Sequence, residues 1–245
     1  MILSREQIEE IAVSVTDEFS KTYRKRRRRH YYDPIDAVPI EKFATDFLGL
    51  EILFAPLSID GSICGLTTYI DTEYRYELDG KTVVLPLKQN QIVLDSRFNQ
   101  PNQTPSLRAR GRFTLAHECV HQLLFHLEAD DVQDACKRQY SERRPYSLRE
   151  LKTREDWNEW QANVLGAAIL MPKDEIRQTM QDGFGQIYKI VSYGGDFRRC
   201  DRWKLKDICK MLEVSMPAAI IRLRDLGYLE EYIPEAYLDS LEGIG

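Results

Sequence analysis

Two histidines one helical turn apart, His117 and His121, enclose a glutamate, so that residues 117–121 match the pattern H-E-x-x-H. Side chains four residues apart share one face of a helix, and both imidazoles can therefore reach the same metal ion. Zinc accepts neutral imidazole and carboxylate ligands, and a catalytic zinc site has three protein ligands and a water. The pattern predicts a Zn²⁺ site, although two ordinary core or surface histidines of a helix would give the same five residues.

The glutamate between the histidines, Glu118, indicates what such a site would do. A structural zinc site needs only ligands, whereas a hydrolytic site also needs a carboxylate that accepts a proton from the water at the metal. Glu118 is therefore the predicted general base. We expect its replacement by glutamine to leave the metal bound and to abolish cleavage.

The third ligand must come from outside this motif. His126 lies five residues after His121, about 140° further round the helix, so it points elsewhere. The extended pattern H-E-x-x-H-x-x-G-x-x-H also fails, because Leu124 stands where that pattern has glycine. Cys119 lies about 200° from His117 and is interpreted as a core thiol.

A second predicted helix, residues 156–171, offers a carboxylate at a suitable place. Glu159 and Asn163 lie one turn apart on one face, and the small residues 166–168 would let this helix approach the first closely. Glu159 is then the candidate ligand, and Asn163 could bind the free ring nitrogen of a ligand histidine. Physical reasoning alone does not choose Glu159 over the neighbouring acids Glu150, Glu155 and Asp156.

The elements that position these residues are short strands followed by helices. Runs of β-branched and aromatic residues lie between turn signals ahead of the first metal-binding helix, which is expected at residues 110–127; these runs are 50–55, 66–70, 82–87 and 91–95. They predict an antiparallel sheet of about four strands and an α+β fold. The last strand is expected to offer an edge that pairs with an extended substrate.

The N-terminal segment reads as a helix that starts at a capping box of Ser4 and Gln7 and leads into a basic run from Arg24 to Arg29. Such a run could bind phosphates or acidic partners, but a solvated basic helix end or loop is the commoner explanation.

Near the C-terminus, residues 204–229 have the pattern of a helix-turn-helix, with Pro217 at the start of the second helix. From residue 201 to residue 230 there are six Lys or Arg and five Asp or Glu. A DNA reader would be expected to show a basic face there. The near-neutral balance favours packing or protein recognition over direct nucleic-acid binding.

The composition favours a soluble cytoplasmic protein. The net charge of −5 gives no reason for the whole chain to bind nucleic acid, and no apolar stretch approaches the length of a membrane span. The N-terminus lacks the apolar core of a signal peptide. Five scattered cysteines without a C-x-x-C pair indicate reduced thiols.

Four segments together resemble the ImmA/IrrE family of intracellular zinc metallopeptidases: I-V-L-D at 92–95, R-F-T-L-A-H-E-C-V-H at 112–121, E-W-Q-A-N at 159–163 and L-M-P at 170–172. The resemblance spans roughly residues 35–230. It implies that Glu159, the glutamate of the family's E-x-x-A-N motif, is the third zinc ligand. It also implies a small thermolysin-like zincin, with an antiparallel sheet packed on the H-E-x-x-H helix, that cuts a helix-turn-helix repressor.

The sequence thus predicts an N-terminal helix with a basic run (1–33), a zincin-like metallopeptidase domain (34–185) and a helix-turn-helix-like segment (186–245). The expected function is zinc-dependent cleavage of a regulatory protein, with no membrane partner. The alternatives are a zincin-fold regulator that binds DNA or protein without turnover, and a metal-free α+β domain.

Overall fold

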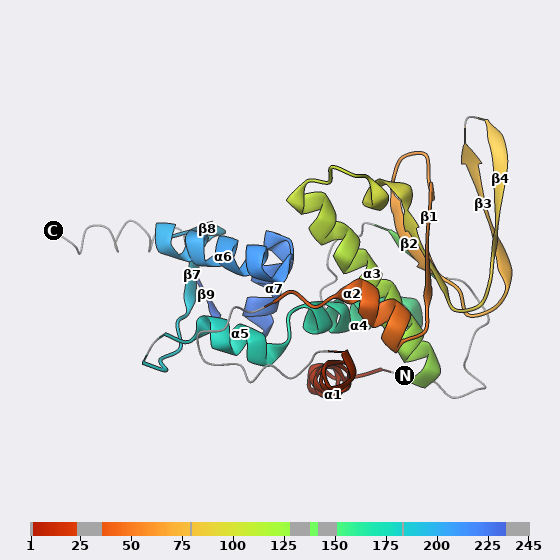
Figure 1. Ribbon diagram of the computed structural model, residues 1–245. Coiled ribbons are helices and arrows are strands. Elements are labelled where there is room, and N and C mark those ends of the chain that lie inside the picture. Colours follow the sequence, from red (N-terminus) through yellow and green to blue (C-terminus); the bar gives the residue numbers. More distant parts are fainter. Residues whose placement is uncertain are drawn as a thin grey trace. The chain divides into compact units, whose positions relative to one another are not determined.

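The computed structural model describes most of the chain: residues 2–23, 36–78, 80–127, 138–141, 151–182 and 184–233. These residues fall into two compact units (Figure 1). The first contains the N-terminal helix and the described residues from Val38 to Leu170, and the second contains residues 36–37 and the described residues from Met171 onward. In the described part, seven α-helices and small mixed sheets confirm the α+β class. The basic run from Arg24 to Arg29 lies outside the described residues.

The first unit holds most of the strands. Its elements are, in chain order, α1 (Arg5–Tyr23), α2 (Ile40–Lys42), the π-helix η1 (Phe43–Phe47), β1 (Glu51–Ala55), β2 (Ile63–Thr67), β3 (Thr72–Leu78), β4 (Lys81–Leu87), β5 (Gln91–Asp95), the 3₁₀-helix η2 (Ser96–Asn99), α3 (Pro105–Leu127), β6 (Arg138–Ser141) and α4 (Arg154–Leu170).

Helix α1 starts at the predicted capping box. The Ser4 backbone N–H donates to Gln7 Oε1 (2.9 Å), and the Gln7 N–H donates to Ser4 Oγ (3.2 Å). Ile8 and Phe19 are buried on the same side of the helix, which packs against α4. The predicted capping box is therefore confirmed.

The main sheet is mixed, with strand order β1-β5-β2-β6. β2 pairs antiparallel with both β5 and β6, but β1 runs parallel to β5. The expectation of an antiparallel sheet is therefore wrong for this pair. Strand periodicity shows which faces are apolar but not the direction in which distant strands pair, and the chain between β1 and β5 is long enough for a crossover.

The position of β5 also corrects the expected substrate edge. β5 lies between β1 and β2, so both of its sides are already paired. All five of its residues are buried, as expected for a central strand covered on both faces. Among the described strands of this sheet, the edges are β1 and β6.

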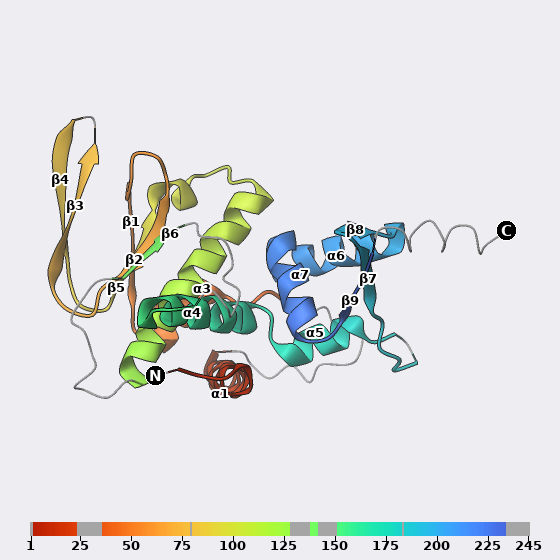
Figure 2. The same ribbon diagram turned by 180° about the vertical axis from the view of Figure 1, so that it is seen from behind.

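The two faces of this sheet have different partners (Figures 1 and 2). On one face lies α3, where the Gln122 side-chain amide donates to Thr67 Oγ1 on β2 (2.7 Å). On the other face, Leu66 and Val93 pack with Tyr74 of the β3–β4 hairpin in a buried apolar cluster. The first unit is thus layered, with helices on one side of the sheet and a hairpin on the other.

Helix α3 begins five residues earlier than expected, at Pro105. Thr104 precedes it, and its Oγ1 accepts a hydrogen bond from the Leu107 N–H (3.2 Å). A threonine followed by proline is a common helix start. The start could therefore have been read from the sequence.

Helix α4 comes close to α3 at Gly166. A Cβ added there would lie 3.4 Å from the backbone nitrogen of His117 and 3.5 Å from the carbonyl carbon of Ala116. Only a very small residue allows this approach without displacement. The expectation that the small residues 166–168 permit close packing is confirmed at this position.

The second unit contains the predicted helical pair and a sheet that was not expected. Its elements are α5 (Lys173–Met180), β7 (Ile190–Tyr193), β8 (Asp196–Phe197), α6 (Arg199–Leu212), α7 (Met216–Asp225) and β9 (Leu229–Tyr232). Ser215 caps α7 by accepting from the Ala218 N–H (3.3 Å). The strands form the order β8-β7-β9, with β7 parallel to β9. None of the helices in the described part of the chain has the length and hydropathy of a membrane span.

Candidate metal centre

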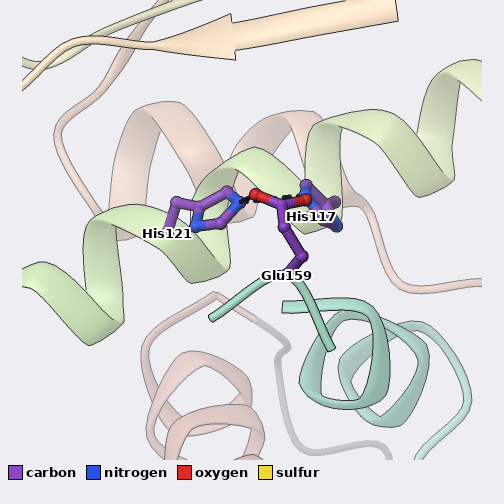
Figure 3. Close-up of side chains that lie close together, drawn as sticks. All are labelled: His117, His121 and Glu159. Atoms are coloured by element: carbon purple, nitrogen blue, oxygen red, sulfur yellow. Dashed lines mark hydrogen bonds and ion pairs between the residues drawn. The ribbon is translucent and has the colours of Figure 1, made fainter. Parts of the chain in front are cut away.

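Three side chains from two helices converge in the first unit: His117 and His121 from α3 and Glu159 from α4 (Figure 3). The Nε2 atoms of the two histidines are 2.9 Å apart. The Glu159 carboxylate oxygens lie 3.3 Å from His117 Nε2 and 3.2 Å from His121 Nε2. The structure therefore brings together the two histidines and the glutamate that the sequence singled out.

The spacing of these atoms suits a zinc ion. Two atoms that each lie about 2.0–2.1 Å from a tetrahedral zinc are roughly 3.4 Å from each other. The three separations around His117, His121 and Glu159 are within about half an ångström of that value. Two imidazoles and one carboxylate are also a known ligand set of catalytic zinc, and they leave the fourth position open.

The ring of His117 has a hydrogen-bond partner on its other nitrogen. Asn163 Oδ1 on α4 lies 3.1 Å from His117 Nδ1. An amide oxygen can only accept, so Nδ1 carries a proton and donates to Asn163, while Nε2 faces the cluster. This arrangement is typical of metal-ligating histidines, whose second nitrogen is usually held by a polar group.

Glu159 is ionised in this environment. Its burial by itself raises the pKa of the carboxyl, but hydrogen bonds with His117 and His121 and their charges lower it more, so the net pKa is below its ordinary value. A buried carboxylate beside two imidazoles is a strongly favourable place for a divalent cation, which would compensate the charge.

Glu118 lies next to this group and is fully buried. Among the described residues, neither of its carboxylate oxygens has a hydrogen-bond partner. Burial first, and then the negative charge of Glu159, raise the pKa of Glu118 well above its usual value. A buried carboxylate without a partner is costly, and structural carboxylates are normally hydrogen-bonded. The arrangement suits a group that exchanges a proton with a bound molecule.

Gly65 on β2 is a neighbour of Glu118 that the sequence reasoning missed. A Cβ added at Gly65 would lie 2.7 Å from Thr114 Cγ2 and 3.0 Å from Glu118 Oε1. The glycine therefore lets the strand lie directly against α3 at the carboxylate. A single glycine inside a strand-like run is a signal of close backbone approach, and it could have pointed to this position.

The other candidates do not join the cluster. His126 is exposed at the end of α3, and Cys119 is buried, as expected of a core thiol. Burial, with the charges of Glu118 and Glu41, raises the pKa of the Cys119 thiol well above its usual value, which keeps it protonated.

The alternative acids near Glu159 have other surroundings. Glu155 is exposed, and Asp156 Oδ2 accepts hydrogen bonds from Thr153 at the start of α4. Glu150 lies outside the described residues. Of the four acids that the sequence left open, the structure places Glu159 at the histidines.

No protein-family model matches the chain, and a comparison with curated proteins finds no match either. The buried His117–His121–Glu159 group on two helices, as in zinc sites of the H-E-x-x-H type, is therefore the main structural support for a metalloenzyme.

Proposed function

We propose that the protein is a zinc-dependent endopeptidase with a reduced zincin fold. His117, His121 and Glu159 would hold the ion, and Glu118 would act as general base. The observation that carries this proposal is the fully buried Glu118 carboxylate, which has no hydrogen-bond partner among the described residues and lies beside the metal-ligand group. A protein that only bound metal would have no need of such a costly group.

A bound zinc ion would supply a Lewis acid that acidifies water and polarises a peptide carbonyl. Glu118 would accept the proton of the attacking water and donate it to the leaving amine. Its raised pKa favours the protonated form, from which the proton is donated to the leaving amine. Asn163 would hold His117 in orientation, and Gly65 would let β2 shield the carboxylate from bulk water.

The substrate would be a peptide in extended conformation. β6 is the edge strand that adjoins β2, and a peptide pairing with its free side would be separated by β6 from the strand that carries Gly65. This replaces the expected edge at β5, which has no free side. Backbone hydrogen bonds would align the peptide with β6, and this alignment would depend little on the side chains of the substrate.

The proposed target is a cytoplasmic regulatory protein, specifically a helix-turn-helix repressor. This assignment rests on the resemblance to the ImmA/IrrE family. Features of the second unit favour protein over DNA as its partner. Arg222 on α7 is buried and its Nε donates to the Met171 carbonyl (3.0 Å), and Arg224 pairs with Glu231 (2.5 Å). Two basic residues of the second helix are thus engaged within the unit.

The metal centre is tested by the zinc content of purified protein, measured by elemental mass spectrometry. We expect about one zinc per chain, a large loss in His117→Ala and Glu159→Gln, and no change in the control His126→Ala. Absence of zinc from the wild-type protein after reconstitution would remove the basis of the proposal. Loss in His117→Ala alone would move the third ligand away from Glu159.

The hydrolytic step is tested by comparing new protein N-termini in cells that express wild-type protein or Glu118→Gln. We expect Glu118→Gln to retain zinc and to lose cleavage by at least about 100-fold, because it cannot accept the proton. Equal cleavage by both proteins would contradict the assignment of Glu118. Zinc binding without any cleavage by the wild type would favour a non-catalytic regulator.

A further inference from the structure

A second concave site lies in the first unit, on the other side of α3 from the histidines. It is a pocket of about 170 Å³ between α3 and the β1 side of the sheet. Arg108, which lines it, is about 180° around the helix from His117. The pocket is therefore separate from the metal centre. Its apolar wall consists of Ile52, Phe54, Leu94, Phe98 and Leu115.

The wall of this pocket is held in place by close packing. Gly111 of α3 lies against the ring of Phe98, so that a Cβ added at Gly111 would lie 3.1 Å from two ring carbons. The Gln103 side-chain amide donates to the Phe98 backbone carbonyl. Both contacts fix η2 against the start of α3, and the pocket is formed without a ligand.

The polar groups at the pocket carry an excess of positive charge. Arg108 and Arg112 line it together with a single acid, Glu41. Arg112 is 7% exposed; its Nη2 donates to the Val38 carbonyl (2.7 Å), and its Nη1 lies 3.9 Å from Glu41. Arg108 is exposed, and no carboxylate in the described part of the chain forms an ion pair with it. Two guanidinium groups and one carboxylate leave one positive charge unmatched.

We propose that this pocket binds a small organic monoanion, namely a monocarboxylate with one aromatic ring. A cavity of about 150 Å³ lined by Leu, Ile and Phe holds benzene in another protein, so 170 Å³ accommodates one ring. The ring packs against Phe54 and Phe98, and the carboxylate pairs with Arg108. A neutral analogue lacks the charge pairing, and a cationic analogue is repelled by the guanidinium groups.

The test is a titration of ¹⁵N-labelled full-length protein with benzoate, benzamide and benzamidine, followed by NMR. We expect benzoate to bind with Kd on the order of 1 mM, as usual for so small a ligand, with shifts at residues 52–54 and 108–115. Benzamide and benzamidine should bind at least about tenfold more weakly. The titration is repeated on His117→Ala, because a carboxylate could also bind at a metal; the shifts around Arg108 should persist there.

Two variants and one control locate the site. Arg108→Gln changes an exposed side chain and should weaken benzoate binding by about fivefold or more. Ile52→Trp fills the pocket and should abolish binding. Arg75→Gln, an exposed arginine on β3, should bind benzoate as the wild type does. Equal affinity for benzoate and benzamide, or unchanged binding in both Arg108→Gln and Ile52→Trp, would overturn the proposal, whatever the outcome for the metal centre.

Discussion

At the scale of single residues, the candidate metal centre is defined by which polar groups have partners. His117 is held by Asn163 on one nitrogen and faces Glu159 with the other. Glu118 has neither a hydrogen bond nor exposure to water within the described structure. In the proposed enzyme, the hydrogen bond of His117 would serve to orient a ligand, and the unpaired carboxylate of Glu118 would serve proton transfer.

We expect Asn163→Ala to weaken zinc binding by about 10- to 100-fold, because the His117 ring loses the acceptor that fixes its tautomer and orientation. Competition with a chromophoric chelator measures the affinity. The matched control is Gln161→Ala on the same helix, about 200° around it from Glu159, which removes a hydrogen bond from the Leu3 N–H (2.6 Å). Unchanged zinc affinity in Asn163→Ala would contradict the role given to the amide.

Glu118 should make the metal-free protein less stable as the pH rises. Its pKa in the folded state lies above the ordinary value of 4.5, so the folded state binds the proton more tightly than the unfolded state does. Stability is then lost as the pH rises from about 4.5 toward the folded-state pKa. We expect Glu118→Gln to raise the free energy of unfolding at pH 7, because a neutral amide of similar shape has no charge to bury.

Urea unfolding with a chelator present, at pH 4.5 and pH 7, measures this difference. The gain in Glu118→Gln should be present at pH 7 and nearly absent at pH 4.5, where the unfolded-state carboxyl is half protonated. Glu155→Gln, an exposed glutamate on α4, is the control and should show little change at either pH. A gain of equal size at both pH values would mean that ionisation of Glu118 is not its cause.

At the scale of elements, the site depends on how closely three segments approach one another. α3 carries His117, Glu118 and His121, α4 reaches it at Gly166, and β2 reaches it at Gly65. At Gly65 an added Cβ would overlap a side chain of α3 (2.7 Å), and at Gly166 it would touch the α3 backbone (3.4 Å). The close approach of β2 and α4 to one helix is therefore what encloses His117, Glu118 and His121.

We expect Gly65→Ala to destabilise the protein by roughly 1–3 kcal/mol, because the added methyl group would overlap Thr114 Cγ2 (2.7 Å) and press on Glu118 (3.0 Å). Thr114→Ser removes the methyl group that causes the closer overlap. The double variant should regain part of the lost stability in thermal or urea unfolding. Full stability of Gly65→Ala alone would contradict the close approach of β2 to α3.

At the scale of the whole molecule, the described residues divide into two units with their own secondary structure. The candidate ligands His117, His121 and Glu159 all belong to the first unit, whereas the helical pair α6–α7 belongs to the second. A ligand that binds only the folded form of one unit stabilises that unit directly. Zinc should therefore stabilise the first unit more than the second.

We expect saturating zinc to slow amide hydrogen exchange in α3 and α4 by on the order of 100-fold when the free zinc is about 100 times its Kd. Exchange in α6 and α7 should change little. Hydrogen exchange followed by mass spectrometry measures both units in one sample, and His117→Ala serves as the control without a metal effect. Equal slowing in all four helices would show that the two units open together.

The sequence by itself determined the features that depend on local spacing. The common face of His117 and His121 follows from helical periodicity, and the capping box of Ser4 and Gln7 lies within one turn. The α+β class follows from separate runs of strand-like and helical pattern. Each of these is decided by residues close together in the chain, where geometry is nearly fixed by the backbone.

Only the tertiary structure decided which distant residues meet. It placed Glu159, and not Glu155 or Asp156, at the histidines, and it brought Asn163 to His117 across 46 residues. It also made β1 parallel to β5, gave β5 a central position and set Gly65 against Glu118. The physical reason is that the same local pattern of apolar residues is compatible with several strand directions and helix contacts. The packing of the whole core selects one of them.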